Sequence, residues 1–375
     1  MTSRKHYVYA WISYIVAFSG VSEFYFDIRT DNIRKSRLLR IYSRIISLYL
    51  LCHFGVKVFL ACYNVDTLST RSKLMTLYLW GRPGVMLLSL GSSIFCVQMG
   101  QQRIFEMVRD LLRMDEFITV SNSCFNHSKK PQLQKFYWIK IFVFVQQTVI
   151  LILWMFTSNS DILFTLAIQG AVNILRGAYF LLLNIIWQIC YSFMALQIYL
   201  EQLFVDPMAM SRKAPKVFEA HRKYYKLLNM LNELCDIFKY QLSCYLLNLI
   251  CNACISGYSF CRMMLGNPLT LNSSINEWIS LFMNISNLFE LYILASIAHT
   301  ASRLHDETFL ILRYSPYDSD VIERSNDWLA LQLKWQNKSI NIFGVLHIDL
   351  NLFFAVVTGI VLHIIYIIQS DYEFL

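Results

Sequence analysis

Long apolar segments separated by polar loops recur along the whole chain. A helix needs about 20 mostly apolar residues to cross a bilayer, and seven segments reach that length. These segments are Ile41–Cys62, Leu74–Gln98, Tyr137–Phe156, Ile162–Leu200, Tyr240–Leu265, Trp278–Ser302 and Phe343–Ile368. The pattern predicts an all-α membrane protein with seven transmembrane helices.

Some of these helices are expected to continue beyond the membrane. Ile162–Leu200 is too long for one crossing at 1.5 Å per residue. The fifth and sixth spans run into the amphipathic flanks Val217–Lys239 and Arg303–Arg313. A shorter apolar stretch, Tyr7–Val21, follows two basic residues, as a signal peptide does. Because it is rich in aromatics and lacks a small-residue cleavage site, we favour a short helix at the inner interface.

The basic residues predict the orientation of the chain. The loops on one side of the predicted membrane carry 25 Lys and Arg, and those on the other side carry two. Positive residues gather on the cytosolic side, so the N-terminus is expected inside and the C-terminus outside. The sequon at Asn272 falls in a loop assigned to the outside, which agrees and predicts a glycosylated residue there.

The composition narrows the class of protein. Apolar residues make up 56% of the chain, charged residues 15%, and mean hydropathy is +0.43. A soluble enzyme, a nucleic-acid-binding module and a disordered chain are all disfavoured. The ten cysteines lie mostly within apolar runs, and the Cys251–Cys254 pair has no histidine nearby, so packing roles are favoured over metal or redox chemistry.

Motifs for catalysis are missing from the sequence. The eight histidines form no HxxHH or HExxH pattern, and no glycine-rich phosphate loop is present. We therefore expect neither enzymatic activity nor a cofactor or metal. An Asp-Arg-Tyr after the third span and an Asn-Pro-x-x-Tyr in the seventh are also missing, which together with the inside N-terminus disfavours a G-protein-coupled receptor.

Polar side chains inside the membrane are costly and therefore informative. Glu290 is the one acidic residue deep in spans one to six, and Arg176 is expected at a similar depth in the fourth span. We predict that they form an ion pair; the alternative is that each pairs with backbone or water.

Aromatic and amide side chains in the outer halves of spans two to six suggest a pocket for a small-molecule ligand. An interfacial aromatic belt with hydrogen bonds between helices is the alternative. Few of these side chains are acidic, which favours a non-sugar ligand. The predicted ligand-binding residues are Tyr78, Trp80, Arg82, Trp154, Gln169, Asn173, Tyr258, Phe282, Asn284 and Asn287.

The C-terminal sequence resembles the insect gustatory receptor family. Members carry a phrase like F-x-L-Q before the last span, then G-hydrophobic-F-x-h-D/N-x-x-L, then TYhhhhhQF, where h is hydrophobic. This chain has Trp328-Leu-Ala-Leu-Gln-Leu, then Gly344-Val-Leu-His-Ile-Asp-Leu-Asn-Leu, then an apolar run ending at Gln369. It departs from the last motif, with Leu362-His363 in place of Thr-Tyr and Ser370 in place of Phe.

The resemblance implies a ligand-gated cation channel of four subunits in the plasma membrane of sensory neurons, opened by a tastant or contact cue. It implies a cytosolic N-terminal segment (1–40), six helices holding the ligand (41–302), a cytosolic anchor segment (303–342) and a pore helix with an outer tail (343–375). The expected partners are the ligand, membrane lipids, permeating cations and either identical or related subunits, with no nucleic acid. The alternative is a non-conducting receptor that works only with partner receptors.

A stripe along the seventh span is the candidate pore lining. These positions recur at helical spacing on one face, and apolar rings there would gate by dewetting. The alternative is that this face packs against spans five and six. His363 beside the stripe suggests acid sensitivity, against a packing role as the alternative. The predicted pore and gate residues are Thr358, Leu362, Ile365, Tyr366 and Gln369.

Overall fold

A computed structural model gives the structure of the chain. It describes residues 13–27, 30, 32–63, 73–121, 131–157, 162–205, 210–265, 274–314, 320–335, 340–343 and 346–370.

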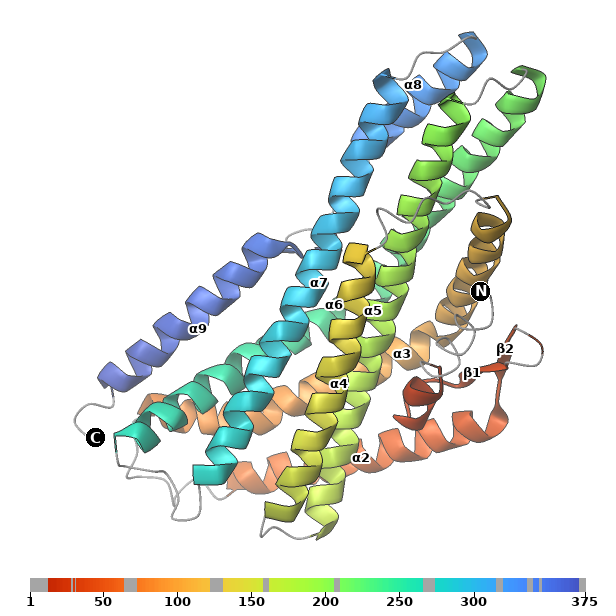
Figure 1. The fold of residues 1–375 in the computed structure, drawn as a ribbon. Helices are drawn as coiled ribbons and strands as arrows, with labels where there is room; N and C mark the ends of the chain where they lie inside the picture. The colour runs from red at the N-terminus through yellow and green to blue at the C-terminus, as the bar shows by residue number, and fades with distance from the viewer. Residues whose placement is uncertain are drawn as a thin grey trace.

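Long helices dominate the described part of the chain (Figure 1). Each of the seven predicted apolar segments lies wholly or mostly on one of them. Amphipathic α8 spans Asp320–Trp335, and two short hairpins, β1–β2 (Phe24–Asp27, Asn32–Lys35) and β3–β4 (Asn341–Ile342, Leu346–His347), complete the set. The seven helices are α2 (Arg37–Tyr63), α3 (Lys73–Ser121), α4 (Pro131–Thr157), α5 (Ile162–Val205), α6 (Met210–Met264), α7 (Ser274–Tyr314) and α9 (Leu350–Ser370).

The helices confirm a membrane protein with several crossings. Among the residues described, five stretches are long and apolar enough to span a bilayer, on α3, α5, α6, α7 and α9. Trp138–Leu153 of α4 forms a shorter apolar helix. The total of seven crossings and the direction of insertion stay predictions.

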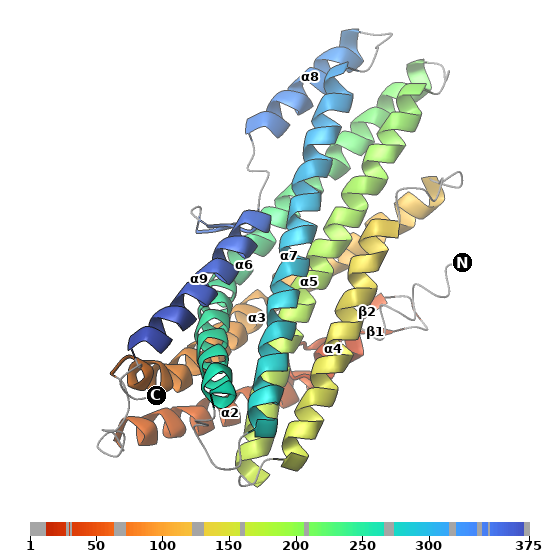
Figure 2. The ribbon, with the colours of Figure 1, turned by 60° about the vertical axis from the view of Figure 1, so that its left-hand side comes forward.

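α5 is the central helix of the bundle. Its side chains are buried almost without interruption from Ala178 to Leu196, because α3, α4, α6 and α7 pack around it (Figure 2). With 44 residues it is about 66 Å long, far more than the roughly 30 Å of a hydrocarbon core. The predicted extension of this segment beyond the membrane is therefore a single continuous helix.

The extended ends of α5, α6 and α7 project together, and α8 folds back on them (Figure 1, top). Leu329 and Ala330 on α8 are buried against this extension. The amphipathic flanks thus bury their apolar faces against each other, as their sequence pattern predicts.

The N-terminal segment is packed against the bundle. Residues 13–18 are helical, and Val16 and Val21 are buried in the main core. Gln101 of α3 donates to the carbonyl of Val21 at 2.8 Å, and Arg40 of α2 pairs with Glu23 at 2.8 Å. The turn after this helix therefore sits among α2, α3 and α5.

The last helix begins later than the sequence predicts. The prediction placed its start at Phe343, but the β3–β4 hairpin occupies that region and α9 starts at Leu350. Phe343 has φ +53°, which suits a tight turn and not a helix. Asp349 caps α9, since its Oδ1 accepts from the N–H of Leu352 at 2.8 Å.

Candidate ligand site and pore helix

A cluster of charged and polar side chains lies buried between α4, α5 and α7. Lys140 of α4 and Glu290 of α7 form a direct ion pair, and their side chains are 1% and 2% exposed. The Lys140 ammonium also lies 5.1 Å from the centre of the Tyr179 ring and 5.8 Å from that of Phe180. One carboxylate and two aromatic faces therefore compensate the charge of Lys140.

The structure gives Glu290 a different direct partner from the predicted one. Arg176 of α5 lies within electrostatic range of Glu290. However, its Nη2 contacts Met283 Sδ at 3.3 Å, and its Nη1 is buried without a hydrogen-bond partner. The predicted Arg176–Glu290 ion pair is therefore replaced by Lys140–Glu290.

Tyrosines and amides surround this ion pair. Tyr179 donates to the carbonyl of Glu290 at 3.0 Å, and Tyr245 donates to that of Asn287 at 3.3 Å. The two tyrosine rings stack at 4.6 Å. Gln147 of α4 donates to Asn287 Oδ1 at 3.2 Å, while its own Oε1 is buried and unpartnered. The cluster thus links α4, α5, α6 and α7.

A second polar cluster joins α6 and α7. Asn284 Nδ2 donates to Ser256 Oγ at 2.6 Å and to the carbonyl of Ser280 at 2.9 Å. The hydroxyl oxygens of Ser256 and Ser280 are 2.9 Å apart, within hydrogen-bond distance. Asn284 Oδ1 is buried without a partner. Here the amide both ties two helices together and keeps a free acceptor.

The predicted ligand-binding residues do not all converge. Asn284 and Asn287 lie in the two clusters, and Tyr258 is fully buried on α6, with Arg262 Nη1 at 3.5 Å from its hydroxyl. Gln169 and Asn173 are half-buried on α5, and Gln169 Oε1 has no partner. Arg82 and Phe282 are exposed on the surface of the chain. The side chains of Tyr78, Trp80 and Trp154, and all of Asn272, lie outside the described residues.

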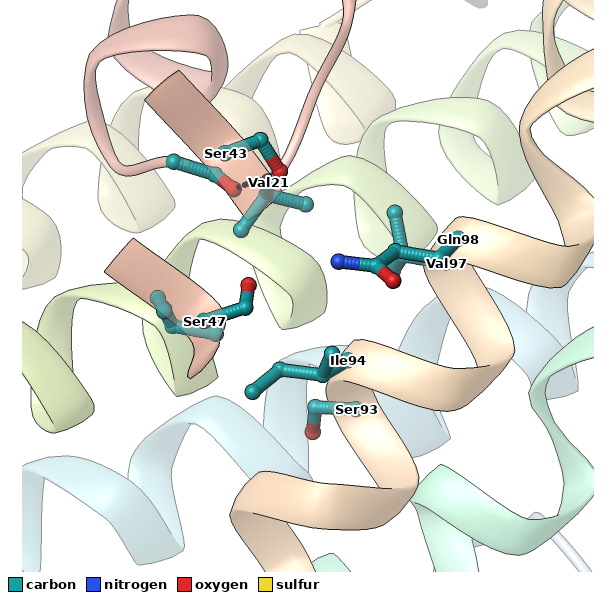
Figure 3. Close-up of a pocket in the computed structure, with 9 residues that line it drawn as sticks. Val21, Ser43, Ser47, Ser93, Ile94, Val97 and Gln98 are labelled. Carbon is teal, nitrogen blue, oxygen red and sulfur yellow. Dashed lines mark hydrogen bonds between the residues drawn. The ribbon is translucent and has the colours of Figure 1, made fainter. Parts of the chain in front are cut away.

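A small hollow lies apart from these clusters, between the Gly20–Val21 turn, α2, α3 and α5 (Figure 3). Ser43 and Ser47 line it from α2 and Ser93 from α3. Ser43 donates to the carbonyl of Gly20 at 2.6 Å. None of the predicted ligand-binding residues lines this hollow, and its hydroxyls suit a water more than an apolar ligand.

One face of α9 packs on the chain and the other is uncovered. Ile360 and Ile367 are buried in a cluster with Ala253, Cys254 and Tyr258 of α6. The predicted stripe lies on the opposite, exposed face. Its members are Thr358, Leu362, Ile365, Tyr366 and Gln369.

Potential metal ligands do not cluster among the residues that the structure describes. No group of three or more His, Cys, Asp or Glu side chains is arranged to hold an ion there. Cys251 and Cys254 are free thiols on α6.

The fold and this arrangement define a multi-helix membrane protein. A family model described as "7tm Chemosensory receptor" matches residues 4–374, and the chain belongs to that family. It is 25% identical to the Drosophila melanogaster protein named "Putative gustatory receptor 85a", over 99% of this chain and 94% of that protein. The predicted membership of the insect chemoreceptors is confirmed.

Solved structures share the fold. The insect olfactory receptor OR5 from Machilis hrabei in complex with eugenol superposes with a TM-score of 0.69 at 10% identity, covering 96% of this chain and 97% of that one. The same receptor described without eugenol gives a TM-score of 0.67 at 11% identity, with the same coverage.

Proposed function

We propose that this chemoreceptor is a ligand-gated, non-selective cation channel in which four subunits surround a pore lined by α9. The uncovered face of α9 carries the proposal. The N-terminus lies in the cytosol and the C-terminus outside, in the plasma membrane of a sensory neuron. The uneven distribution of basic residues supports that orientation.

The composition of the α9 face favours a pore over other surroundings. Packing against α6 and α7 uses Ile360 and Ile367, so the stripe does not serve that purpose. A lipid environment suits Leu362 and Ile365 but leaves Thr358 and Gln369 without water. A pore accommodates both kinds of side chain.

The stripe also suggests how the pore closes. An apolar ring formed by Ile365 from each subunit would exclude water when narrow, and a ring of Gln369 one turn away would contact a partly hydrated ion. Widening the Ile365 ring would wet the pore and allow cations through.

The buried clusters between α4, α5, α6 and α7 are the proposed ligand site. They contain unpartnered acceptors on Gln147 and Asn284 and an unpartnered donor on Arg176. Buried polar groups are normally satisfied, so these atoms are suited to bind a small polar molecule. The ligand class supported by this chemistry is a small molecule with both donors and acceptors.

Subunit number and conductance together test the proposal. Single-particle imaging of the purified protein should show fourfold particles, and Gln369→Ala should change conductance or resting leak. Val357→Ala is the matched control, because Val357 is half-buried on α9 and lies about 80° or more around the helix from every residue of the stripe. A stable monomer or dimer that passes no current alone or with related receptors contradicts the channel. Current only on co-expression supports a mixed assembly.

A further inference from the structure

The buried cluster at α4, α5 and α7 holds more positive than negative charge. Lys140 and Arg176 are cations, and Glu290 is the carboxylate that interacts with both. The remaining polar members are the phenols of Tyr179 and Tyr245 and the amides of Gln147 and Asn287, which carry no charge. The cluster therefore carries one uncompensated positive charge in the apolar interior of the bundle.

The two cations are not equally satisfied. Lys140 contacts the Glu290 carboxylate and two aromatic rings. Arg176 has a thioether sulfur, a weak acceptor, at 3.3 Å from Nη2. Arg176 is only 6% exposed, and its Nη1 has no hydrogen-bond partner. The excess charge is thus located on Arg176.

A buried guanidinium without an acceptor is expensive. Glu290 does not supply this acceptor in the structure, because its Oε1 pairs with Lys140 and the Arg176 guanidinium contacts Met283 instead. Adding one monovalent anion at Arg176 would bring the cluster to neutrality. That anion would also supply the acceptor that Nη1 lacks.

We propose that Arg176 binds the carboxylate of a small organic acid, so that the ligand of this receptor is an anion at neutral pH. This rests on the proposed function of the cluster as the ligand site. A planar guanidinium matches a carboxylate with two parallel hydrogen bonds. Gln147 Oε1 accepts a donor from the remainder of the ligand, since Gln147 is joined to Asn287, one turn along α7 from Met283.

Thermal unfolding of the detergent-purified full chain tests this without any need for current. The probes are hexanoate, lactate and benzoate at pH 7, each compared with its uncharged methyl ester. At saturating concentration, at least one acid should raise the melting temperature by about 3 °C more than its ester. If no acid exceeds its ester, the proposal is wrong.

Variants locate the effect at Arg176. Arg176→Gln should abolish the shift caused by the acid. Arg103→Gln is the matched control, because it removes the same charge from an exposed position on α3 and should keep the shift. An acid-induced shift that persists in Arg176→Gln overturns the assignment.

Two further arms keep the test decisive. Arg176→Lys keeps the positive charge but loses the two parallel donors of the guanidinium. The acid concentration needed for half of the melting-temperature shift should therefore rise about tenfold. An unchanged concentration contradicts the bidentate site even if Arg176→Gln fails to fold. Chloride should give no comparable shift, and an equal shift would assign the site to inorganic anions. If the acid raises the melting temperature but the protein conducts no current, only the proposed channel is refuted and the anion site at Arg176 stands.

Discussion

At the scale of single residues, the Lys140–Glu290 pair shows why a buried charge needs its partner. Both side chains are almost completely enclosed, so neither can exchange its partner for water. Removing one member of such a pair leaves an uncompensated charge, whereas removing both need not. The pair therefore constrains α4 and α7 to one arrangement.

This leads to a test by double substitution. Lys140→Met or Glu290→Gln alone should lower stability by about 3–5 kcal/mol, seen as a large drop in melting temperature and surface expression. The double variant should recover much of the loss. A double variant as unstable as the sum of the two would show that the residues do not act as a pair.

Buried His221 should make the extension formed by α5, α6, α7 and α8 sensitive to acid. It lies on the charged part of α6 before the predicted span, with Ser325 of α8 at 3.2 Å and Asn326 beside it. Burial lowers the pKa of His221 from 6.5 to about 4, against a smaller opposing effect of Asn326. The unfolded chain therefore binds a proton near pH 6.5 that the folded chain does not.

Stability from His221 is fully present above pH 6.5 and is lost as the pH falls toward 4. The loss approaches roughly 3 kcal/mol at about 1.4 kcal/mol per pKa unit. Melting temperatures of the purified protein between pH 7.5 and 4.5 should fall less steeply in His221→Gln than in the original chain. Parallel slopes in the two proteins would exclude His221 as the cause.

At the scale of elements, a close approach fixes α9 to α6. A Cβ added at Gly257 would lie 2.3 Å from Ile364 Cδ1, so a larger residue at 257 would require Ile364 to reorient or the two helices to separate. Ile364 sits beside the buried face of α9, one turn from Ile360. The contact sets the distance between α6 and α9, the proposed pore helix.

Gly257→Ala should therefore shift α9 or reorient Ile364, and change the resting leak or ligand sensitivity of the proposed channel. Ile364→Ala in the same chain removes the obstructing methyl group and should restore much of the original behaviour. Gly84→Ala is the control, since nothing lies within 4 Å of its added Cβ. Equal effects of the two glycine substitutions would contradict a role of this contact.

The hydropathy pattern predicted the elements well and their partners less well. Apolar length and periodicity located all seven long helices, because bilayer thickness imposes a minimum run of apolar residues. The predicted start of α9 was wrong, because a short hairpin and an N-cap at Asp349 leave only weak signals in the sequence of an apolar stretch. Lys140 was missed because a lysine near a helix end is expected to extend to the interface, and only tertiary packing turns it inward.

At the scale of the whole molecule, insertion direction has a chemical test. Asn272 falls in the sequence between α6 and α7, which the basic residues predict to be outside, and glycosylation occurs on that side. Glycosidase treatment should increase the electrophoretic mobility of the protein from cells, and Asn272→Gln should show the higher mobility without treatment. Glycosylation of Asn272 is incompatible with the reverse orientation. As the complementary control, a cysteine introduced at residue 2 should stay unlabelled in intact cells.

α7 touches both proposed functional regions at once. One face carries Asn287 and Glu290 against α4, α5 and α6, and Tyr292 lies 5.3 Å from Phe353 of α9. A signal from ligand to pore thus needs to cross only one helix, about 10 Å in diameter. Rotation of α7 about its own axis would convert a small displacement at the ligand-facing surface into movement of α9. Such a rigid-body motion needs no chain of side-chain rearrangements between the two regions.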